Sequence, residues 1–322
     1  MGFALGDLGF NLYWASIASF LAVFYTDVFG ISAAAAGTMM LITKIMDAVT
    51  DPLMGALADR TQSRFGKFRP YLLWMALPLA GAGVLTYSTP DLSENGKLLW
   101  AYGTYSLLML CYTAINIPYS ALSGVITANS QDRTTLVSFR FIGGFTGGIL
   151  VTYLTPKLVP WLGQGDDVLG WQLTMGLFGL AAALLFLCTF ASTRERIQPV
   201  SSAPAPVWQD IRDLAGNKPW LVLFCLALII MITITMRASS AVYYFKYYLQ
   251  QPQLIGEFLS SYMLALALGA ASTPLLTRFF DKKTLMMGLM GLAGVLSLAL
   301  YFVPPDNISA VFALNLAIGF VL

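Results

Sequence analysis

The sequence contains no histidine and few charged residues. Only 11% of its 322 residues are Asp, Glu, Lys or Arg, against roughly 25% in a soluble domain. By contrast, 57% are hydrophobic and the mean hydropathy is +0.72. Without histidine, the chain lacks the commonest acid–base group and the commonest transition-metal ligand. This composition predicts an all-α protein that crosses a membrane repeatedly, and we expect neither enzymatic activity nor a cofactor.

Other features are scarce as well. The three cysteines, Cys111, Cys188 and Cys225, lie in apolar runs without metal-site spacing, so we expect buried free thiols. A net charge of only +2 gives no indication of a nucleic-acid surface. The start of the chain lacks a basic region followed by a cleavage site, and we therefore expect no signal peptide.

Long apolar runs dominate the chain. A membrane-spanning helix needs about 20 mostly apolar residues, and nine runs meet this length: 4–29, 33–58, 71–88, 98–126, 136–162, 171–193, 220–249, 254–280 and 284–303. A tenth run begins near Ile308 and stops at Leu322, which is too short to cross. We therefore expect the sequence to be part of a longer protein.

One polar link interrupts this pattern. Residues 194–219 contain "QPVSSAPAP", and proline and serine at this density are typical of a flexible linker. We predict a six-helix half over 1–193, a cytoplasmic linker over 194–219 and an incomplete second half over 220–322. A weak repeat agrees with this division, because "ADRTQSRFGKFRP" follows span 2 and "TRFFDKKTL" follows span 8. Parallel repeats of six helices are the plan of major facilitator transporters.

The basic residues predict the orientation. Cytoplasmic loops of membrane proteins carry an excess of Lys and Arg. Twelve of the eighteen basic residues lie in the links after spans 2, 4, 6 and 8. We therefore place those links and the N-terminus in the cytoplasm, with the protein in the bacterial inner membrane.

Span 2 carries three charged residues, Lys44, Asp47 and Asp51, which lie on one helical face. Charged residues within a membrane span suggest a functional site. Lys44 can compensate one carboxylate, and Na⁺ or a shared proton can compensate the other. Carboxylate, hydroxyl and carbonyl oxygens are suitable ligands for a hard cation. The alternative is a structural salt-bridge cluster that holds helices together.

Span 4 carries a polar stripe formed by Tyr112, Asn116 and Ser120 at four-residue intervals. Hydroxyl and amide groups suit sugar hydroxyls, and an aromatic ring suits the apolar face of a sugar. Hydrogen bonding between helices is the alternative explanation. In span 1, Asn11 is a further candidate for the same cavity.

Two arginines lie within other spans. Arg140 in span 5 needs an acceptor, for which Asp47, Asp51 or an oxygen-rich substrate are candidates. Arg237 in span 7 is a further candidate for the charge network. The glycines of "FRFIGGFTGGIL" predict close helix packing rather than a phosphate loop.

Three segments together resemble one known family. "FYTDVFG" after span 1, "DAVTDPLMGALADRTQSRFGKFRP" across span 2 and "YTAINIPYSAL" in span 4 are similar to the glycoside–pentoside–hexuronide:cation symporters. This family belongs to the major facilitator superfamily and includes the melibiose permease. The resemblance implies twelve helices, alternating access, and uptake of a sugar or glycoside coupled to H⁺, Na⁺ or Li⁺.

The resemblance also implies residue roles. It places the cation at Asp47, Thr50, Asp51 and Thr113, and the sugar at Asn11, Tyr112, Asn116, Ser120 and Arg140. The melibiose permease has aspartates where Asn11 and Asn116 stand and a tryptophan where Ser120 stands. It has an asparagine at the position of Thr50. Fewer carboxylates beside Arg140 favour an anionic sugar such as a uronide or its oligosaccharide, although asparagine also binds neutral sugars. A hydroxyl at Thr50 favours H⁺ over Na⁺.

The basic loop after span 2 completes the set of candidates. We expect it to pair with Asp59 and with acidic helix ends of the second half, and so to latch one state of the transporter; orientation alone is the simpler explanation. Its basic residues are Arg60, Arg64, Lys67 and Arg69.

An exporter or a lysolipid-type transporter on the same fold is the alternative function. The expected partners are a small sugar or glycoside and the lipid bilayer, and the expected oligomeric state is a monomer.

Overall fold

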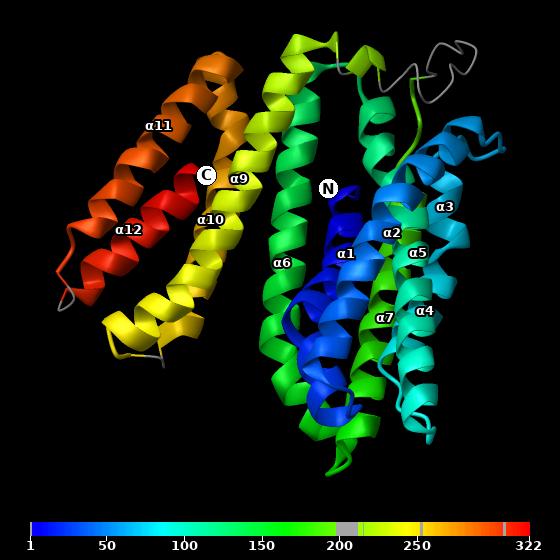
Figure 1. Ribbon diagram of the computed structural model, residues 1–322. Coiled ribbons are helices and arrows are strands. Elements are labelled where there is room, and N and C mark those ends of the chain that lie inside the picture. The colour runs from blue at the N-terminus through cyan, green and yellow to red at the C-terminus, as the bar shows by residue number, and fades with distance from the viewer. Residues whose placement is uncertain (1, 198–211, 215, 252–253, 305–306) are drawn as a thin grey trace. The chain divides into compact units, whose positions relative to one another are not determined.

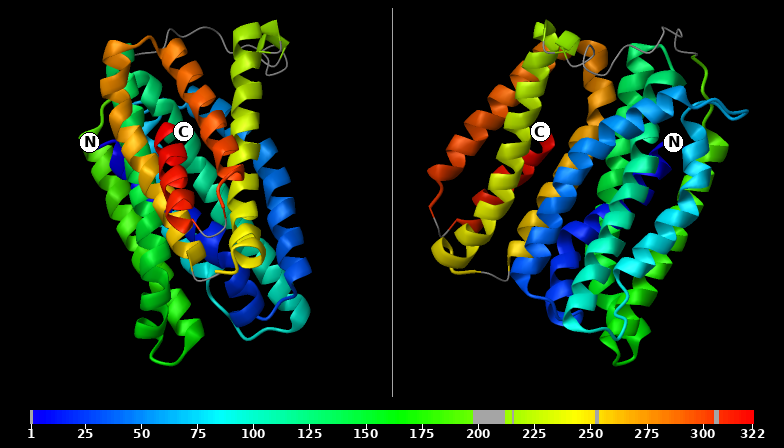
Figure 2. Two further views of the ribbon diagram at one scale, coloured as in Figure 1. Left: turned by 90° about the vertical axis from the view of Figure 1, so that its left-hand side faces the viewer. Right: turned by 45° about the vertical axis from the view of Figure 1, so that its right-hand side comes forward.

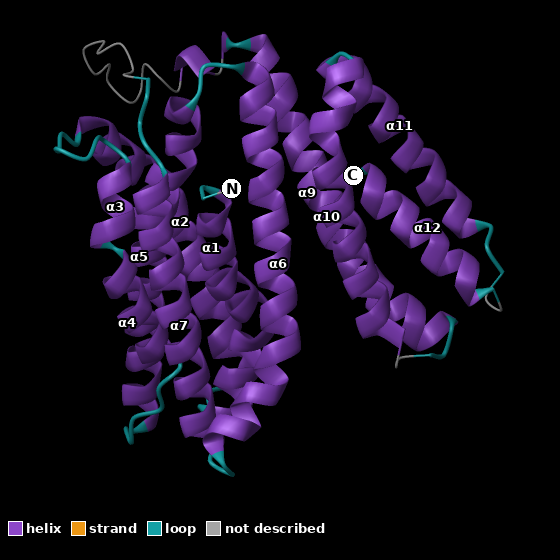
Figure 3. Cartoon of the chain, turned by 180° about the vertical axis from the view of Figure 1, so that it is seen from behind, coloured by secondary structure: helices purple, strands orange, loops and turns teal. Residues whose placement is uncertain are grey.

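The computed structural model describes residues 2–197, 212–214, 216–251, 254–304 and 307–322. In these ranges the chain is helical and contains no strand (Figure 3). An all-helical chain is what a bilayer requires, because a helix satisfies its backbone N–H and C=O groups internally. The all-α fold predicted from the sequence is confirmed, whereas the Pro- and Ser-rich part of the predicted linker lies outside the described residues.

The helices follow the predicted spans (Figure 1). They are α1 (Ala4–Ser16), which continues into the π-helical turns η1 (Ile17–Leu21) and η2 (Phe24–Val28), α2 (Ala33–Arg60), α3 (Arg69–Trp74), α4 (Ala76–Thr86), α5 (Glu94–Ile126), α6 (Ser130–Gly163), α7 (Asp167–Ser192), α9 (Lys218–Tyr243), η3 (Tyr244–Tyr248), α10 (Ile255–Phe279), α11 (Lys282–Tyr301) and α12 (Ile308–Val321). Five of them, α2, α5, α6, α7 and α11, are long and apolar enough to cross a membrane unaided.

Several helices begin at a side-chain cap. The first N–H groups of a helix lack partners within the helix, and Ser, Asn or Asp before it accepts from them. Ser32 accepts from Ala35 at the start of α2, and Asn129 accepts from two backbone N–H groups at the start of α6. Asp166 caps α7 in the same way. These caps fix the starts of α2, α6 and α7.

The third predicted span is broken rather than continuous. α3 ends at Trp74, and α4 begins two residues later. Pro78 explains the break, because proline lacks an N–H and its ring clashes with the carbonyl group four residues earlier, which here belongs to Trp74.

The described chain forms two compact units. The first contains the described residues within 1–198 and 267–285, and the second contains those within 199–266 and 286–322. In the first unit α1 lies beside α6, α4 beside α7, and α2 beside α5 (Figure 2). Its core contains many aromatic side chains, among them the fully buried Tyr13, Tyr25, Tyr87 and Phe186. The predicted half boundary at residue 193 stays a prediction.

The face of α2 that carries apolar side chains is exposed. Leu41, Ile45, Val49, Leu53 and Leu57 follow one another at four-residue intervals, and each is at least 56% exposed. An aliphatic stripe of this kind suits contact with lipid. Cys188 and Cys225 are also exposed, so the expectation of buried thiols is correct only for Cys111. Their helices carry apolar side chains on outer as well as inner faces, and position in an apolar run therefore does not predict burial.

Glycines allow α6 to approach α1 closely. A Cβ atom on Gly143 would lie 2.4 Å from the carbonyl oxygen of Ala4, and one on Gly147 would lie 2.8 Å from that of Leu8. Gly148 faces open space instead. The predicted packing role is therefore confirmed for Gly143 and Gly147.

We expect Gly143→Ala to destabilise the protein by about 1–3 kcal/mol, because the added methyl group overlaps backbone atoms of α1. Gly148→Ala is the matched control, since it makes the same chemical change five residues later and meets nothing. Thermal unfolding in detergent measures the difference. Equal melting temperatures for the two variants would contradict the assigned contact.

Candidate functional site

A cluster of charged and hydroxyl side chains joins α2 to α5. Lys44 Nζ lies 3.0 Å from Asp47 Oδ2, and the hydroxyl of Thr113 donates to Asp51 Oδ1 at 2.9 Å. The two aspartates lie one turn apart on α2, and Thr113 is buried on the facing helix. We call Lys44, Asp47, Asp51 and Thr113 the α2 cluster.

The α2 cluster retains unused acceptor capacity. Asp47 Oδ1 is buried and has no hydrogen-bond partner. A buried carboxylate oxygen without a partner is costly, and a cation or a proton would remove that cost. The Thr50 hydroxyl turns back to the carbonyl oxygen of Asp47 at 3.5 Å. The cation role of these residues stays a prediction.

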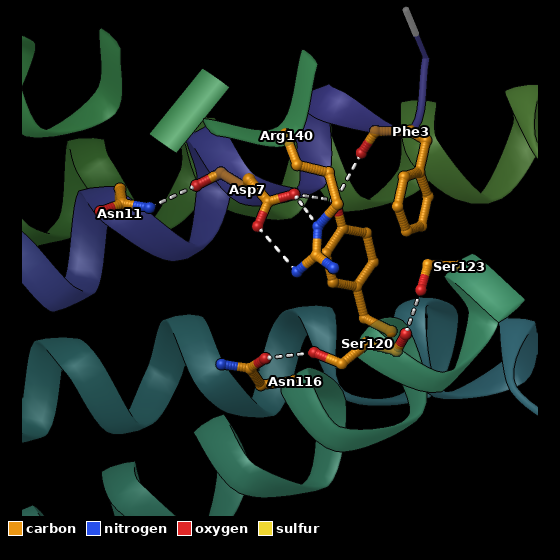
Figure 4. A network of polar contacts seen from close by, with 8 residues as sticks. Phe3, Asp7, Asn11, Asn116, Ser120, Ser123 and Arg140 are labelled. Atoms are coloured by element: carbon orange, nitrogen blue, oxygen red, sulfur yellow. Dashed lines mark hydrogen bonds and ion pairs between the residues drawn. The ribbon is translucent and has the colours of Figure 1, made fainter. Parts of the chain in front are cut away.

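A second polar cluster surrounds Arg140. Its Nε lies 2.7 Å from Asp7 Oδ2, and its Nη2 lies 3.1 Å from Asp7 Oδ1, so the pair is bidentate (Figure 4). The Tyr119 hydroxyl donates to the Asp7 carboxylate and is also 2.6 Å from the carbonyl oxygen of Phe3. The guanidinium group lies over the rings of Phe3 and Tyr119. We call Phe3, Asp7, Tyr119 and Arg140 the arginine cluster.

The acceptor of Arg140 corrects the sequence-based expectation. Asp47 and Asp51 were the protein candidates, but the partner is Asp7. Sequence reasoning missed Asp7 because it lies near the start of its span, where a carboxylate suggests a solvated helix end. A signal was present nevertheless: Asp7 and Asn11 lie four residues apart and share a helical face. The Asn11 amide donates to the backbone oxygen of Asp7 at 3.0 Å.

The predicted sugar-binding stripe on α5 lies beside the arginine cluster. Figure 4 shows Asn116 and Ser120 in the same region as Asp7, Asn11 and Arg140 but on a different helix. The Ser120 hydroxyl donates to Asn116 Oδ1 at 3.3 Å. The structure thus brings Asn11, Asn116, Ser120 and Arg140 to one region of the first unit, and it adds Asp7.

An aromatic pair lies beside the α2 cluster. The ring centroids of Trp14 and Tyr112 are 6.2 Å apart, and Lys44 Nζ lies 4.9 Å from the Trp14 ring. Trp14 is 42% exposed, which leaves its ring accessible. The same lysine therefore contacts a carboxylate of the α2 cluster and an aromatic surface suited to a sugar.

The basic loop after α2 is held by its backbone. The backbone N–H groups of Lys67, Phe68 and Arg69 donate to the Glu195 carboxylate at 2.9, 2.8 and 3.0 Å. Arg69 Nη2 also donates to the carbonyl oxygen of Phe190 at 2.7 Å. Glu195 follows α7 in the same unit, so this carboxylate does not belong to the second half.

The side chains of this loop form no ion pair within the described ranges. Asp59, Arg60 and Arg64 are exposed there, and the guanidinium of Arg64 lies over the ring of Phe65. The expected pairing of the loop with Asp59 is therefore wrong in this structure. The predicted latch to the second half stays a prediction.

Arg237, the remaining predicted residue, lies in the second unit. Its Nη2 donates to Asn315 Oδ1 at 2.6 Å, and its guanidinium lies 4.7 Å from the centre of the Tyr262 ring. The Asn315 amide donates in turn to Ser261 and to the backbone of Phe258. This network links α9, α10 and α12 through neutral partners.

Comparison with known proteins agrees with this architecture. Residues 2–322 match the family described as MFS/sugar transport protein. A solved structure of the proton:xylose symporter XylE superimposes with a TM-score of 0.62 at 15% identity, covering 99% of this chain and 78% of that one, which shows the shared fold.

Three curated proteins are similar in sequence. Escherichia coli (strain K12) YagG, provisionally described as a glycoside/cation symporter, is 38% identical over 100% of this chain and 70% of its own length. The inner membrane symporter YicJ of the same organism is 37% identical over 99% and 69%. The isoprimeverose transporter of Lactiplantibacillus pentosus is 35% identical over 89% and 61%.

These findings confirm the family resemblance predicted from the sequence. The family model matches nearly the whole chain, and the chain covers more than two thirds of YagG and of YicJ, each more than 30% identical to it. These matches identify an integral membrane protein of a transporter family. The chain belongs to the MFS/sugar transport protein family.

Proposed function

We propose that the protein moves a sugar or glycoside across the membrane together with a cation, by alternating access of its two halves to a central site. The observation that carries this proposal is the pairing of the α2 cluster with a sugar-type surface on α1 and α5. Carboxylate oxygens suit a small cation, and the amide, hydroxyl and aromatic groups nearby suit a polyol. The names of relatives, a glycoside/cation symporter and an isoprimeverose transporter, support the same function.

Lys44 supplies a physical route for coupling. It compensates Asp47 in the structure and also lies over Trp14. When a cation joins Asp47 and Asp51, Lys44 loses part of its attraction to the carboxylate. The lysine is then free to shift relative to the aromatic surface, so cation binding alters the surface that receives the sugar.

We propose H⁺ as the coupling ion, with Na⁺ as the alternative. A transferred proton needs one carboxylate oxygen, whereas Na⁺ needs several oxygens around it. The Thr50 hydroxyl is directed at the backbone of its own helix and not at Asp51. This arrangement leaves few ligands beyond the two carboxylates and Thr113.

Uptake of a panel of radiolabelled sugars and glycosides by the full-length protein tests the proposal. We expect accumulation that follows a pH gradient at zero Na⁺ gradient and that a protonophore abolishes. Accumulation that requires Na⁺ at fixed pH and membrane potential would contradict H⁺ coupling but retain symport. Absence of uptake and of counterflow for every sugar would contradict the function, and outward movement alone would favour an exporter.

We also propose the membrane in which the protein lies, its orientation there and its oligomeric state. We place the protein in the bacterial inner membrane as a monomer with a cytoplasmic N-terminus, because the basic residues concentrate in the links that this orientation makes cytoplasmic. A protease site or cysteine label at the N-terminus, probed in intact cells and in inverted vesicles, tests the orientation.

A further inference from the structure

The charge of Arg140 is already compensated within the protein. An arginine beside two asparagines suggested a site for an anionic sugar, because no carboxylate stood at the aligned positions. The structure supplies that carboxylate from Asp7, one helical turn before Asn11. Both oxygens of Asp7 contact the guanidinium, and the hydroxyl of Tyr119 also donates to this carboxylate.

The ion pair of Arg140 and Asp7 is partly exposed, and neighbouring side chains fix its geometry. The side chain of Arg140 is 22% exposed and that of Asp7 is 16% exposed. Phe3 and Tyr119 stack on one another and lie against the guanidinium. A bidentate ion pair packed against two rings keeps its geometry better than a surface pair does.

The geometry leaves donors for an uncharged ligand. A guanidinium has five N–H groups, and the bidentate contact with Asp7 uses one on Nε and one on Nη2. The remaining N–H groups can donate to a sugar hydroxyl while Asp7 stays in place. A carboxylate ligand would compete with Asp7 for the same positive charge and would leave a partly buried carboxylate uncompensated.

The overall charge of the two clusters agrees with this reasoning. Lys44 and Arg140 are cationic, whereas Asp7, Asp47 and Asp51 are anionic. One negative charge therefore remains, and one coupling cation neutralises it. An uncharged sugar completes a neutral assembly, whereas a uronide would add a charge that these side chains do not balance.

We propose that Asp7 determines the charge of the substrate: by occupying Arg140, it makes the site select neutral glycosides and reject uronides. This inference rests on the proposed function and narrows its substrate class. Asp7 acts through Arg140 and is thus a specificity-determining residue.

Matched glycosides test the inference in the full-length protein. A p-nitrophenyl glucoside and the corresponding glucuronide differ only at C6, where CH₂OH becomes a carboxylate, and galactosides and galacturonides form a second such pair. Binding is measured by competition and counterflow in proteoliposomes. We expect wild-type protein to prefer the neutral member of a pair at least 10-fold. Asp7→Asn frees Arg140 and should shift this ratio at least 10-fold toward the uronide.

Two further variants separate charge from structure. Asp7→Asn/Arg140→Gln removes both charges and should retain the preference for the neutral sugar. Asp27→Asn removes an exposed carboxylate from η2 and should leave the ratio unchanged. A ratio that does not move in correctly folded Asp7→Asn protein would overturn the inference.

The wild-type protein alone keeps the inference falsifiable if Asp7→Asn does not fold. A wild-type preference for uronides would overturn the inference but leave sugar transport intact. Failure to carry any member of the panel would overturn the proposed function and this inference together. The two failures are therefore distinguishable in one assay.

Discussion

Replacing Asp51 by asparagine is expected to abolish cation-driven accumulation of the sugar while sugar exchange continues. The substitution keeps the size of the side chain and keeps an oxygen that can accept from Thr113, which lies 2.9 Å away in the native protein. It removes only the negative charge, which under the proposed function attracts the coupling cation. We expect the apparent affinity for the coupling cation to fall at least about 100-fold, equivalent to about 2.7 kcal/mol.

Counterflow of labelled sugar is the complementary measurement, because exchange against preloaded unlabelled sugar requires the sugar site but no cation gradient. We expect Asp51→Asn to keep counterflow within a few-fold of wild type. Asp59→Asn serves as the control, since it neutralises an exposed carboxylate two turns later on the same helix. Gradient-dependent accumulation by Asp51→Asn protein would show that coupling occurs at other residues.

Asp47→Asn should differ from Asp51→Asn in its effect on Lys44 and the aromatic surface beside it. Asp47 pairs with Lys44, so its loss leaves the lysine uncompensated near the aromatic surface. The two aspartates lie one helical turn apart but have different partners. Asp47 pairs with the charged side chain of Lys44, whereas Asp51 accepts a hydrogen bond from the neutral hydroxyl group of Thr113.

Hydropathy predicted most of the fold. The limits of α2, α5, α6 and α7 differ from the predicted spans by a few residues, because in a bilayer apolar length and backbone satisfaction together leave few alternatives to a helix. The break at Met75 was missed because a run of apolar residues does not indicate where proline removes a hydrogen bond. The π-helical turns after Ser16 were missed for a similar reason, since they depend on packing rather than composition.

The site was predicted less completely. Sequence spacing on one helix identified Asp47 and Asp51, and spacing on another identified Asn116 and Ser120. Spacing cannot reveal which side chain of a different helix reaches Arg140. That contact depends on the approach of α1 to α6, where Gly143 and Gly147 meet the backbone. Asp7 became a candidate only once those helices were placed side by side.

The basic loop illustrates a different limit. Its charged side chains suggested ion pairs, but its strongest contact uses backbone N–H groups. Gly66 makes this possible, because its φ of 105° is accessible mainly to glycine. A Cβ atom on Gly66 would also lie 2.4–2.5 Å from the carboxylate atoms of Glu195. The glycine is therefore required both for the turn and for the space that the carboxylate fills.

Glu195→Ala is expected to destabilise the protein and release this loop. The carboxylate accepts three backbone N–H bonds, and hydrogen bonds to charged groups contribute about 1.5–3 kcal/mol each when well shielded. Glu195 is half-buried, and water can replace part of what is lost. We therefore expect the free energy of unfolding to decrease by about 3 kcal/mol.

Thermal unfolding measures the overall loss of stability in Glu195→Ala, and hydrogen exchange at individual amides shows where in the protein it occurs. The amides of Lys67, Phe68 and Arg69 should exchange much faster in Glu195→Ala than in wild-type protein, because Glu195 is their acceptor. Glu94→Ala removes an exposed glutamate from the first turn of α5 and should leave these amides unchanged. If the three amides stay protected, then the contact of Arg69 with Phe190, rather than the carboxylate, holds the loop against α7.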